Sequence, residues 1–217
     1  AHTIEEVARD SGVSPEEVRS AVATARRRLR RVRAERVRPG LDDKVVTSWN
    51  GLVLRALAEA GAILSEPSYV DEGRRTAEFL LDELRRPDGR VRRSWRKGRA
   101  GQPGFCEDYA SLAIGLFTLY QATGEPRWYR EASTLTTQMI DLFSDPQGGF
   151  YTTGRDAEQL IARPKDHYDG PHPSANSLAA EALLMAWSYS GDPDFRPLAT
   201  ETTRAGGRII ESAPTAA

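Results

Sequence analysis

The sequence predicts an all-α fold made of repeated helical hairpins. A Pro-x-aromatic motif recurs at intervals of roughly sixty residues, which is about the length of one two-helix hairpin with its connection. The helix before each motif is almost entirely apolar, whereas the helix after it has one apolar stripe. We therefore expect the apolar helices to form an inner layer, covered by an outer layer of the amphipathic ones. The three motifs are Pro67-Ser68-Tyr69, Pro126-Arg127-Trp128 and Pro193-Asp194-Phe195.

The N-terminal segment, residues 1–38, predicts a separate helical pair. Two capping boxes mark the starts of helices expected at residues 4–11 and 15–36. The boxes pair Thr3 with Glu6 and Ser14 with Glu17.

Two interpretations of this pair are open. A helix-turn-helix followed by the basic run Arg26–Arg31 is typical of nucleic-acid binding. The same helix, however, has an apolar stripe, so its arginines can form the solvated face of an ordinary amphipathic helix. We favour the solvated face and expect no nucleic-acid partner. The stripe consists of Val18, Val22, Ala25, Leu29 and Val32.

Residues 39–217 predict three helical hairpins. Pro and Gly turns follow the outer helices, and short strands of β-hairpins are expected in the connections near residues 90–95 and 150–153. The inner helices are expected near residues 47–65, 107–121 and 174–191, and the outer helices near 67–86, 126–143 and 193–212.

Composition excludes several classes of protein. The chain has 217 residues, of which 39% are hydrophobic and 28% charged, as in soluble globular proteins. A formal net charge of -1 argues against a nucleic-acid or membrane partner, and no apolar run approaches the roughly 20 residues that span a bilayer. Cys106 is the only cysteine, which excludes an intrachain disulfide and fits a reducing, cytoplasmic location. The chain begins at Ala1 without Met, so we expect it to be a piece of a longer protein.

Polar clusters stand at the starts of the three inner helices. Because these helices are expected to point the same way, their N-termini should meet at one end, where helix dipoles favour carboxylates. The alternative is that Glu107 and Asp108 only cap their helix, which is worth about 0.3–1 kcal/mol. The clusters are Thr47-Ser48-Trp49-Asn50, Glu107-Asp108-Tyr109 and Ser174-Ala175-Asn176.

Several motifs together resemble the YyaL-type, spermatogenesis-associated thioredoxin-domain family, over nearly the whole chain. The resemblance implies a toroid of the six-hairpin glycosidase kind, related in shape to N-acylglucosamine 2-epimerases, that follows a thioredoxin-like domain. This chain has no Cys-x-x-Cys, so the thioredoxin-like part is absent and no redox activity is implied. The pattern differs from the family's at Cys106, His167 and His172. The motifs are residues 38–52, 107–110, 163–166, 168–170 and 173–177.

The resemblance implies carbohydrate processing or binding, with glycosidase-like or epimerase-like acid/base chemistry. Glu107 and Asp108 are the candidate acid/base residues, and glycosidases need a second carboxylate across the substrate. Asp42 and Asp169 are the catalytic candidates for that position, with Asp43 and Asp166 also available. The alternative is a non-catalytic interaction or scaffold module of a thioredoxin-linked protein.

Other side chains at the helix starts suit a sugar ligand. Aromatic faces stack on sugar rings, amides orient hydroxyls, and an epimerase needs a histidine base, although core packing and helix capping explain the same residues. His167 and His172 have no third ligand nearby, so we expect no metal and no cofactor. The binding candidates are Trp49, Asn50, Tyr109, Lys165, His172 and Asn176.

Three hairpins make only about half of a six-hairpin ring. We therefore expect apolar inner-helix surface around Leu54, Leu116 and Leu184 to be uncovered, and the isolated chain to self-associate or to depend on missing hairpins. A sugar site assembled from all the helix starts would be incomplete, so the fragment alone should be inactive.

Overall fold

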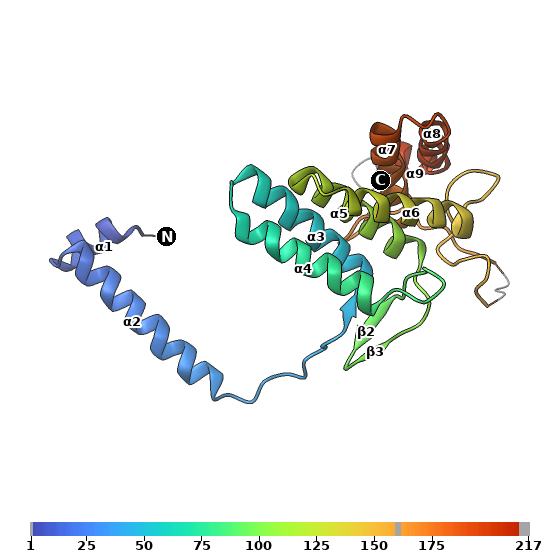
Figure 1. Ribbon diagram of the computed structural model, residues 1–217. Coiled ribbons are helices and arrows are strands. Elements are labelled where there is room, and N and C mark those ends of the chain that lie inside the picture. Colours follow the sequence, from blue (N-terminus) through green and yellow to red (C-terminus); the bar gives the residue numbers. More distant parts are fainter. Residues whose placement is uncertain (1, 159–161, 213–217) are drawn as a thin grey trace. The chain divides into compact units, whose positions relative to one another are not determined.

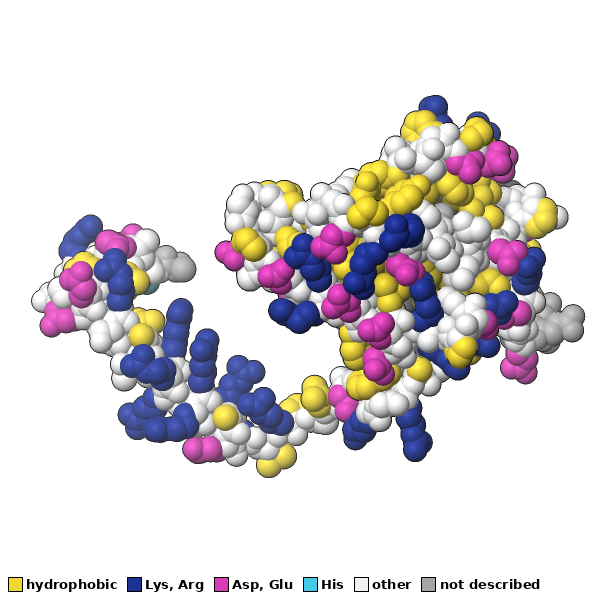
Figure 2. All heavy atoms as spheres, viewed as in Figure 1, with side chains coloured by type: hydrophobic (Ala, Val, Ile, Leu, Met, Phe, Trp, Pro, Cys, Tyr) yellow, Lys and Arg dark blue, Asp and Glu magenta, His cyan; other side chains and the backbone are white. Residues whose placement is uncertain are grey.

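The computed structural model describes residues 2–158 and 162–212, in two compact units divided after Asp42. The first unit contains α1 (Ile4–Ser11) and α2 (Pro15–Ala34). Both predicted capping boxes form, and α1 ends at Gly12, whose left-handed backbone favours glycine. Arginine side chains cover much of α2 (Figure 2).

The apolar stripe of α2 is buried only at its first residue within this unit. Val18 is buried against α1, but Leu29 is 68% exposed and Val32 is also exposed. α1 has only 8 residues and α2 has 20, so α1 covers only part of α2, and the rest of the stripe has nothing to pack on among the described residues of this unit.

The second unit contains the three predicted hairpins (Figure 1). Each pairs an inner helix with the outer helix that follows it. The hairpins are α3 (Thr47–Ile63) with α4 (Pro67–Glu83), α5 (Cys106–Thr123) with α6 (Pro126–Phe143), and α7 (Ala175–Ser190) with α8 (Phe195–Ala205), after which comes the short α9 (Gly207–Ser212). Pro67 and Pro126 occupy the first turn of their helices, but Pro193 lies before α8, which Asp194 precedes as the N-cap.

The inner helices form one layer, with α5 between α3 and α7 (Figure 1). As its apolar density predicts, α5 is buried along nearly its whole length. Each outer helix packs against its own inner helix, which confirms the two-layer arrangement. Arg55 of α3 forms a 2.8 Å ion pair with Glu181 of α7. α3 and α7 lie on opposite sides of α5, so this ion pair can form only if the layer of inner helices is curved. The inner helices of a ring are curved in this way.

α3 and α5 run parallel and approach each other closely through glycine. A Cβ placed on Gly51 would lie 2.6 Å from the carbonyl carbon of Ser111, and one on Gly115 would lie 2.7 Å from the carbonyl oxygen of Gly51. Ser48, in the first turn of α3, lies beside Asp108, in the first turn of α5, and Leu54 lies farther along α3 beside Gly115, farther along α5. Because the two contacts come in the same order along both helices, α3 and α5 run in the common direction that the sequence predicted.

The strands form one small antiparallel sheet, in which β1 (Val45–Val46) comes from the segment before α3, and β2 (Ser94–Arg96) and β3 (Arg99–Ala100) come from the connection between α4 and α5. β1 pairs with β2, which pairs with β3 across a turn. The hairpin predicted near residues 90–95 is therefore present. The strand predicted near 150–153 is not: Phe150 makes only an isolated bridge with Ser144.

The predicted exposure of inner-helix leucines is wrong for two of the three. Leu54 and Leu116 are fully buried, whereas Leu184 is 46% exposed. Leu54 packs on Gly115 of α5, so its side chain points into the existing layer rather than to an open edge. No helix in the described part of the chain is long and apolar enough to cross a bilayer.

Candidate functional site

The starts of α3, α5 and α7 and the loops that lead into them form one end of the inner layer, here called the polar end. Asp108 joins two of these helices. Its Oδ1 accepts a 2.9 Å hydrogen bond from the backbone N–H of Ser48 in α3, and its Oδ2 accepts a 2.8 Å bond from that of Phe105. The carboxylate thus caps α5 and ties it to the first turn of α3.

Arg93 lies beside both carboxylates at the start of α5. Its Nη1 donates to Glu107 and, at 3.2 Å, to Oδ2 of Asp108, while its guanidinium stacks 4.7 Å from the ring centroid of Phe105. The residue precedes β2, so the small sheet positions it. The sequence analysis missed Arg93, because nothing local separates it from the neighbouring arginines.

The two carboxylates have different surroundings. Asp108 is fully buried, and this burial raises its pKa to about 6 although Arg93 and the Phe105 N–H favour the charged form. The Glu107 side chain is 13% exposed and is held by Arg93 alone among the described side chains. Asp108 is therefore enclosed by its donors, and Glu107 is the carboxylate of this pair that a ligand can reach.

Asp169 and Asn176 organise the start of α7. Oδ1 of Asp169 accepts hydrogen bonds from the N–H of Ser174 (2.7 Å) and the hydroxyl of Ser177 (2.9 Å). Burial opposes its charge, but these bonds hold the pKa of Asp169 below its ordinary value. The amide of Asn176 accepts from the N–H of Phe150 at 2.7 Å and donates to its carbonyl at 3.0 Å. Both side chains anchor the loop before α7.

Lys165 anchors the same loop from the other side. Its Nζ donates to the carbonyl of Gly148 and forms a 2.7 Å ion pair with Asp145. The Lys165 ammonium, the N–H of Gln147 and the hydroxyl of Tyr151 lower the pKa of Asp145 to about 2.

The Lys165–Asp145 pair makes stability depend on acid pH. Since the folded-state pKa of Asp145 is below its ordinary value of 3.8, the pair stabilises the fold above about pH 4 and loses this effect as pH falls toward 2. We expect Lys165→Met to be less stable than the wild type at pH 5, and the difference to shrink as the pH falls to 2, by urea unfolding at each pH. The exposed Lys97→Met is the control. A difference that stays constant from pH 5 to pH 2 would assign the role of Lys165 to the Gly148 carbonyl instead.

The other residues that the sequence predicted for the site do not gather around the two carboxylates of α5. Trp49 is 58% exposed on the first turn of α3, and Asn50 donates a 2.8 Å bond to the carbonyl of Val46. His172 is exposed in the loop before α7. Asp42 is the last residue of the first unit, so the structure does not group it with the carboxylates of the second, whereas Asp43 bonds Arg96 of the sheet.

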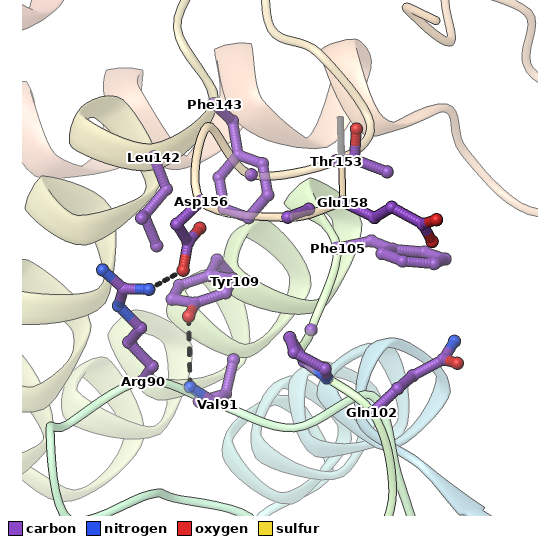
Figure 3. Close-up of a pocket in the computed structure, with 14 residues that line it drawn as sticks. Arg90, Val91, Gln102, Phe105, Tyr109, Leu142, Phe143, Thr153, Asp156 and Glu158 are labelled. Carbon is purple, nitrogen blue, oxygen red and sulfur yellow. Dashed lines mark hydrogen bonds and ion pairs between the residues drawn. The ribbon is translucent and has the colours of Figure 1, made fainter. Parts of the chain in front are cut away.

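A cavity of about 410 Å³ opens beside the start of α5 (Figure 3). Tyr109 and Phe143 form its apolar wall, with ring centroids 5.2 Å apart, and the Tyr109 hydroxyl accepts a 3.2 Å bond from the N–H of Val91. An ion pair between Arg90 and Asp156 lies at its rim. Of the predicted residues only Tyr109 lines it. The sequence analysis did not predict the other lining residues, most of which lie in the connections before α5 and after α6.

Neither a metal nor a reactive thiol emerges from the geometry. Among residues 2–158 and 162–212, no three His, Cys, Asp or Glu side chains are close enough to hold a metal ion. Cys106 is fully buried, and burial raises the pKa of its thiol. The chemistry available at the polar end is that of carboxylates, guanidinium groups and aromatic faces.

Three hairpins in a curved double layer, with the inner helices starting at one end, define this part of the chain as a segment of an α/α toroid of the six-hairpin kind. Solved structures agree. Similar folds are those of cellobiose 2-epimerase from Spirochaeta thermophila (TM-score 0.58, 17% identity, 78% of this chain and 43% of that chain), unsaturated glucuronyl hydrolase from Bacillus sp. GL1 (0.60, 19%, 78% and 48%) and a family 76 α-mannanase from Bacteroides thetaiotaomicron (0.61, 15%, 79% and 47%).

Sequence comparison gives the family. Spermatogenesis-associated protein 20 of Mus musculus is 34% identical over 206 residues, or 89% of this chain, and an uncharacterised protein of Caenorhabditis elegans is 28% identical over 99% of it. The chain belongs to the spermatogenesis-associated protein 20 family, as its motifs indicated. It covers only 26% of the length of the mouse protein. No family model matches the chain.

Proposed function

We propose that this chain is part of a carbohydrate-processing or carbohydrate-binding toroid, with the sugar bound at the polar end. The observation that supports this most is the shared end of α3 and α5, where a reachable carboxylate lies beside a guanidinium. Similar toroids are, by their names, an epimerase, a hydrolase and a mannanase that act on sugars. Glu107 would exchange a proton or a hydrogen bond with a sugar hydroxyl, and the exposed Trp49 would stack on the ring.

The proposed site is built from more than this chain. The relatives are much longer than the region that this chain matches, and we propose that further hairpins and a thioredoxin-like domain complete the parent protein in the cytoplasm. A glycosidase needs a second carboxylate across the substrate. Asp169, held by Ser174 and Ser177, is the candidate on α7. We therefore expect binding without turnover from the isolated chain.

Binding of mono- and disaccharides tests the proposal by thermal shift and titration calorimetry. A ligand at 100 times its Kd stabilises the folded state by about 2.7 kcal/mol, which is a shift of several degrees for a unit of this size. We expect glucose, mannose or cellobiose to give a saturable shift, and Glu107→Gln to weaken it at least about tenfold in Kd by removing the charge-assisted bond. The exposed Glu72→Gln is the matched control. If no sugar changes the melting temperature, the carbohydrate function is excluded for this chain.

A scaffold role is the second candidate, and one observation favours it. Asp108 already accepts hydrogen bonds from Ser48, Phe105 and Arg93, which leaves it little freedom for catalysis. In that case the carboxylates at the start of α5 act only as caps. Glu107→Gln would then leave the protein's function in cells intact, whereas a sugar enzyme would lose nearly all of it.

A further inference from the structure

The cavity beside the start of α5 lies apart from the sugar site proposed above. Neither Glu107 nor Arg93 is among the described residues that line it. Phe105 belongs to both places, because the Arg93 guanidinium stacks on its ring and its side chain also lines the cavity. The cavity can therefore hold a ligand of its own, whether or not a sugar binds at the polar end.

Hydrogen bonds between backbone groups hold both walls of the cavity in place. On one wall, the N–H of Gly104 donates to the carbonyl of Val91 at 2.9 Å. On the other, the N–H of Arg155 donates to the carbonyl of Leu142 at 2.8 Å and ties the loop after α6 to that helix. An ion pair at the rim joins the two walls (Figure 3). The cavity is thus formed before any ligand arrives, and its volume of about 410 Å³ is within the range of roughly 300–1,000 Å³ that is usual for small-molecule sites.

The depth of the cavity is apolar and its mouth is polar. The lining side chains that carry a charge or an amide are at least partly exposed, and Arg90 and Asp156 among them neutralise each other. Glu158 therefore carries the unbalanced charge of the described lining, which is negative. The buried residues of the lining are Val91, Gly104, Tyr109, Leu142 and Phe143.

Tyr109 supplies the one hydrogen-bonding side chain among these buried residues. It is 2% exposed, and its hydroxyl oxygen accepts a hydrogen bond from the N–H of Val91. Burial raises the pKa of Tyr109 above its ordinary value, so the hydroxyl keeps its proton at neutral pH. No group in the described part of the chain accepts that proton, although a buried hydroxyl normally has an acceptor. An oxygen atom of a ligand in the cavity would supply the acceptor.

We propose that the cavity binds an uncharged ring compound whose buried end is apolar and bears one acceptor oxygen. The ring packs on the edge-to-face pair of Tyr109 and Phe143, and the oxygen accepts the proton of the Tyr109 hydroxyl. Release of water from these apolar walls favours binding.

Two other classes of ligand suit the lining less well. A sugar would bring several hydroxyl groups to buried walls that offer one hydrogen-bonding side chain, and each unpaired hydroxyl costs free energy. An anion would have to pass the carboxylate of Glu158, and it would find Arg90 already paired with Asp156.

Three compounds of similar shape test the proposal on the wild-type chain, with heteronuclear NMR as the readout. Acetophenone has a ring and an acceptor oxygen, ethylbenzene has the ring without the acceptor, and benzoate has the ring with a charge. We expect acetophenone to shift the amide signals of Val91, Gly104 and Ala157 saturably, with a Kd on the order of 1 mM, as is ordinary for so small a ligand. Ethylbenzene should bind at the same place about threefold to tenfold more weakly, because one hydrogen bond is lost. Neither benzoate nor glucose should shift these signals.

Tyr109→Phe separates a hydrogen bond to the ligand from a structural role of the hydroxyl. It removes the proton donor and keeps the ring, so we expect acetophenone to bind about threefold to tenfold more weakly and ethylbenzene to keep its wild-type Kd. Tyr69→Phe, which changes an exposed tyrosine of α4, is the matched control and should alter neither Kd. Tyr109→Phe also leaves the N–H of Val91 without its acceptor, so circular dichroism and melting temperature check that the variant is folded. The comparison of compounds on the wild type does not depend on it.

Several results would overturn the proposal. Acetophenone could give no saturable shift, or its shifts could lie away from the cavity. Benzoate or glucose could shift the same amides as strongly, or Tyr109→Phe could prefer acetophenone to ethylbenzene by the wild-type ratio. A sugar bound at the polar end would instead shift the amides around Glu107, so failure of this proposal and failure of the proposed function are distinguishable.

Discussion

Asp108→Ala is expected to lower the free energy of unfolding of the second unit by about 3 kcal/mol at pH 7. Three donors lose their acceptor at once: the N–H groups of Ser48 and Phe105 and the guanidinium of Arg93. The first two are buried, or nearly so, at helix starts where water does not replace the carboxylate. Urea unfolding followed by circular dichroism measures the change, which greatly exceeds the worth of an exposed cap.

The matched changes separate charge from shape. Asp108→Asn keeps the volume of the side chain but turns an NH₂ group toward one of the three donors. We therefore expect its free energy of unfolding to lie between those of the wild type and Asp108→Ala. Asp82→Ala removes an exposed carboxylate from α4 and should change stability by less than about 0.5 kcal/mol. If Asp108→Ala unfolds at the same urea concentration as Asp82→Ala, the link between α3 and α5 does not run through this side chain.

The sequence predicted the carboxylate pair Glu107 and Asp108 at the start of α5, but not Arg93, the side chain that bonds both carboxylates. Capping is a local property, visible in the spacing of Glu107 and Asp108 from the helix start. Arg93 is one of several arginines in the segment before α5, and the residue that faces the carboxylates is decided by the pairing of β1 with β2, in which Val46 lies opposite Ser94. That pairing joins segments far apart in the chain, and no local pattern encodes it.

The density of apolar residues predicted how many sides of α5 are covered, but not which side of its neighbours is open. Leu54 and Leu184 read alike in the sequence, yet one is fully buried and the other half exposed. The inner helix that follows α3 along the chain, α5, packs on α3 and covers Leu54, whereas no inner helix follows α7 in the described part of the chain.

The cavity beside Tyr109 marks another limit of sequence reasoning. Its lining comes from Tyr109 and Phe143 on helices and from two loops that carry Arg90 and Asp156. The helical residues follow from apolar periodicity. The two loops meet through residues that are far apart in the sequence, such as Arg90 and Asp156, and no local pattern pairs them. The sequence therefore predicts the helical residues that line this cavity better than it predicts the loop residues.

Gly51→Ala is expected to lower the free energy of unfolding by about 2 kcal/mol, although alanine favours helix by up to about 1 kcal/mol over glycine. The added methyl would lie 2.6 Å from the carbonyl carbon of Ser111 and 2.7 Å from the N–H of Leu112, which are backbone atoms that cannot turn aside. The helices must separate, and the buried contacts along their joint weaken with them. Gly115→Ala should cost a similar amount, because its methyl meets the carbonyl oxygen of Gly51 at 2.7 Å.

Whether a Gly→Ala change raises or lowers the free energy of unfolding shows whether another backbone lies close to that glycine. Gly73→Ala is the matched control: it lies within α4, and its added methyl meets the side chains of Leu119 and Leu54 at an ordinary 3.5 Å. Helix propensity then dominates, and we expect this variant to be more stable than the wild type by up to about 1 kcal/mol. Because Gly51 and Gly115 share one contact, the double variant should cost less than the sum of the single changes. Urea unfolding of the wild type and the four variants measures these differences, and stabilisation by Gly51→Ala would show that α3 and α5 are farther apart than the structure places them.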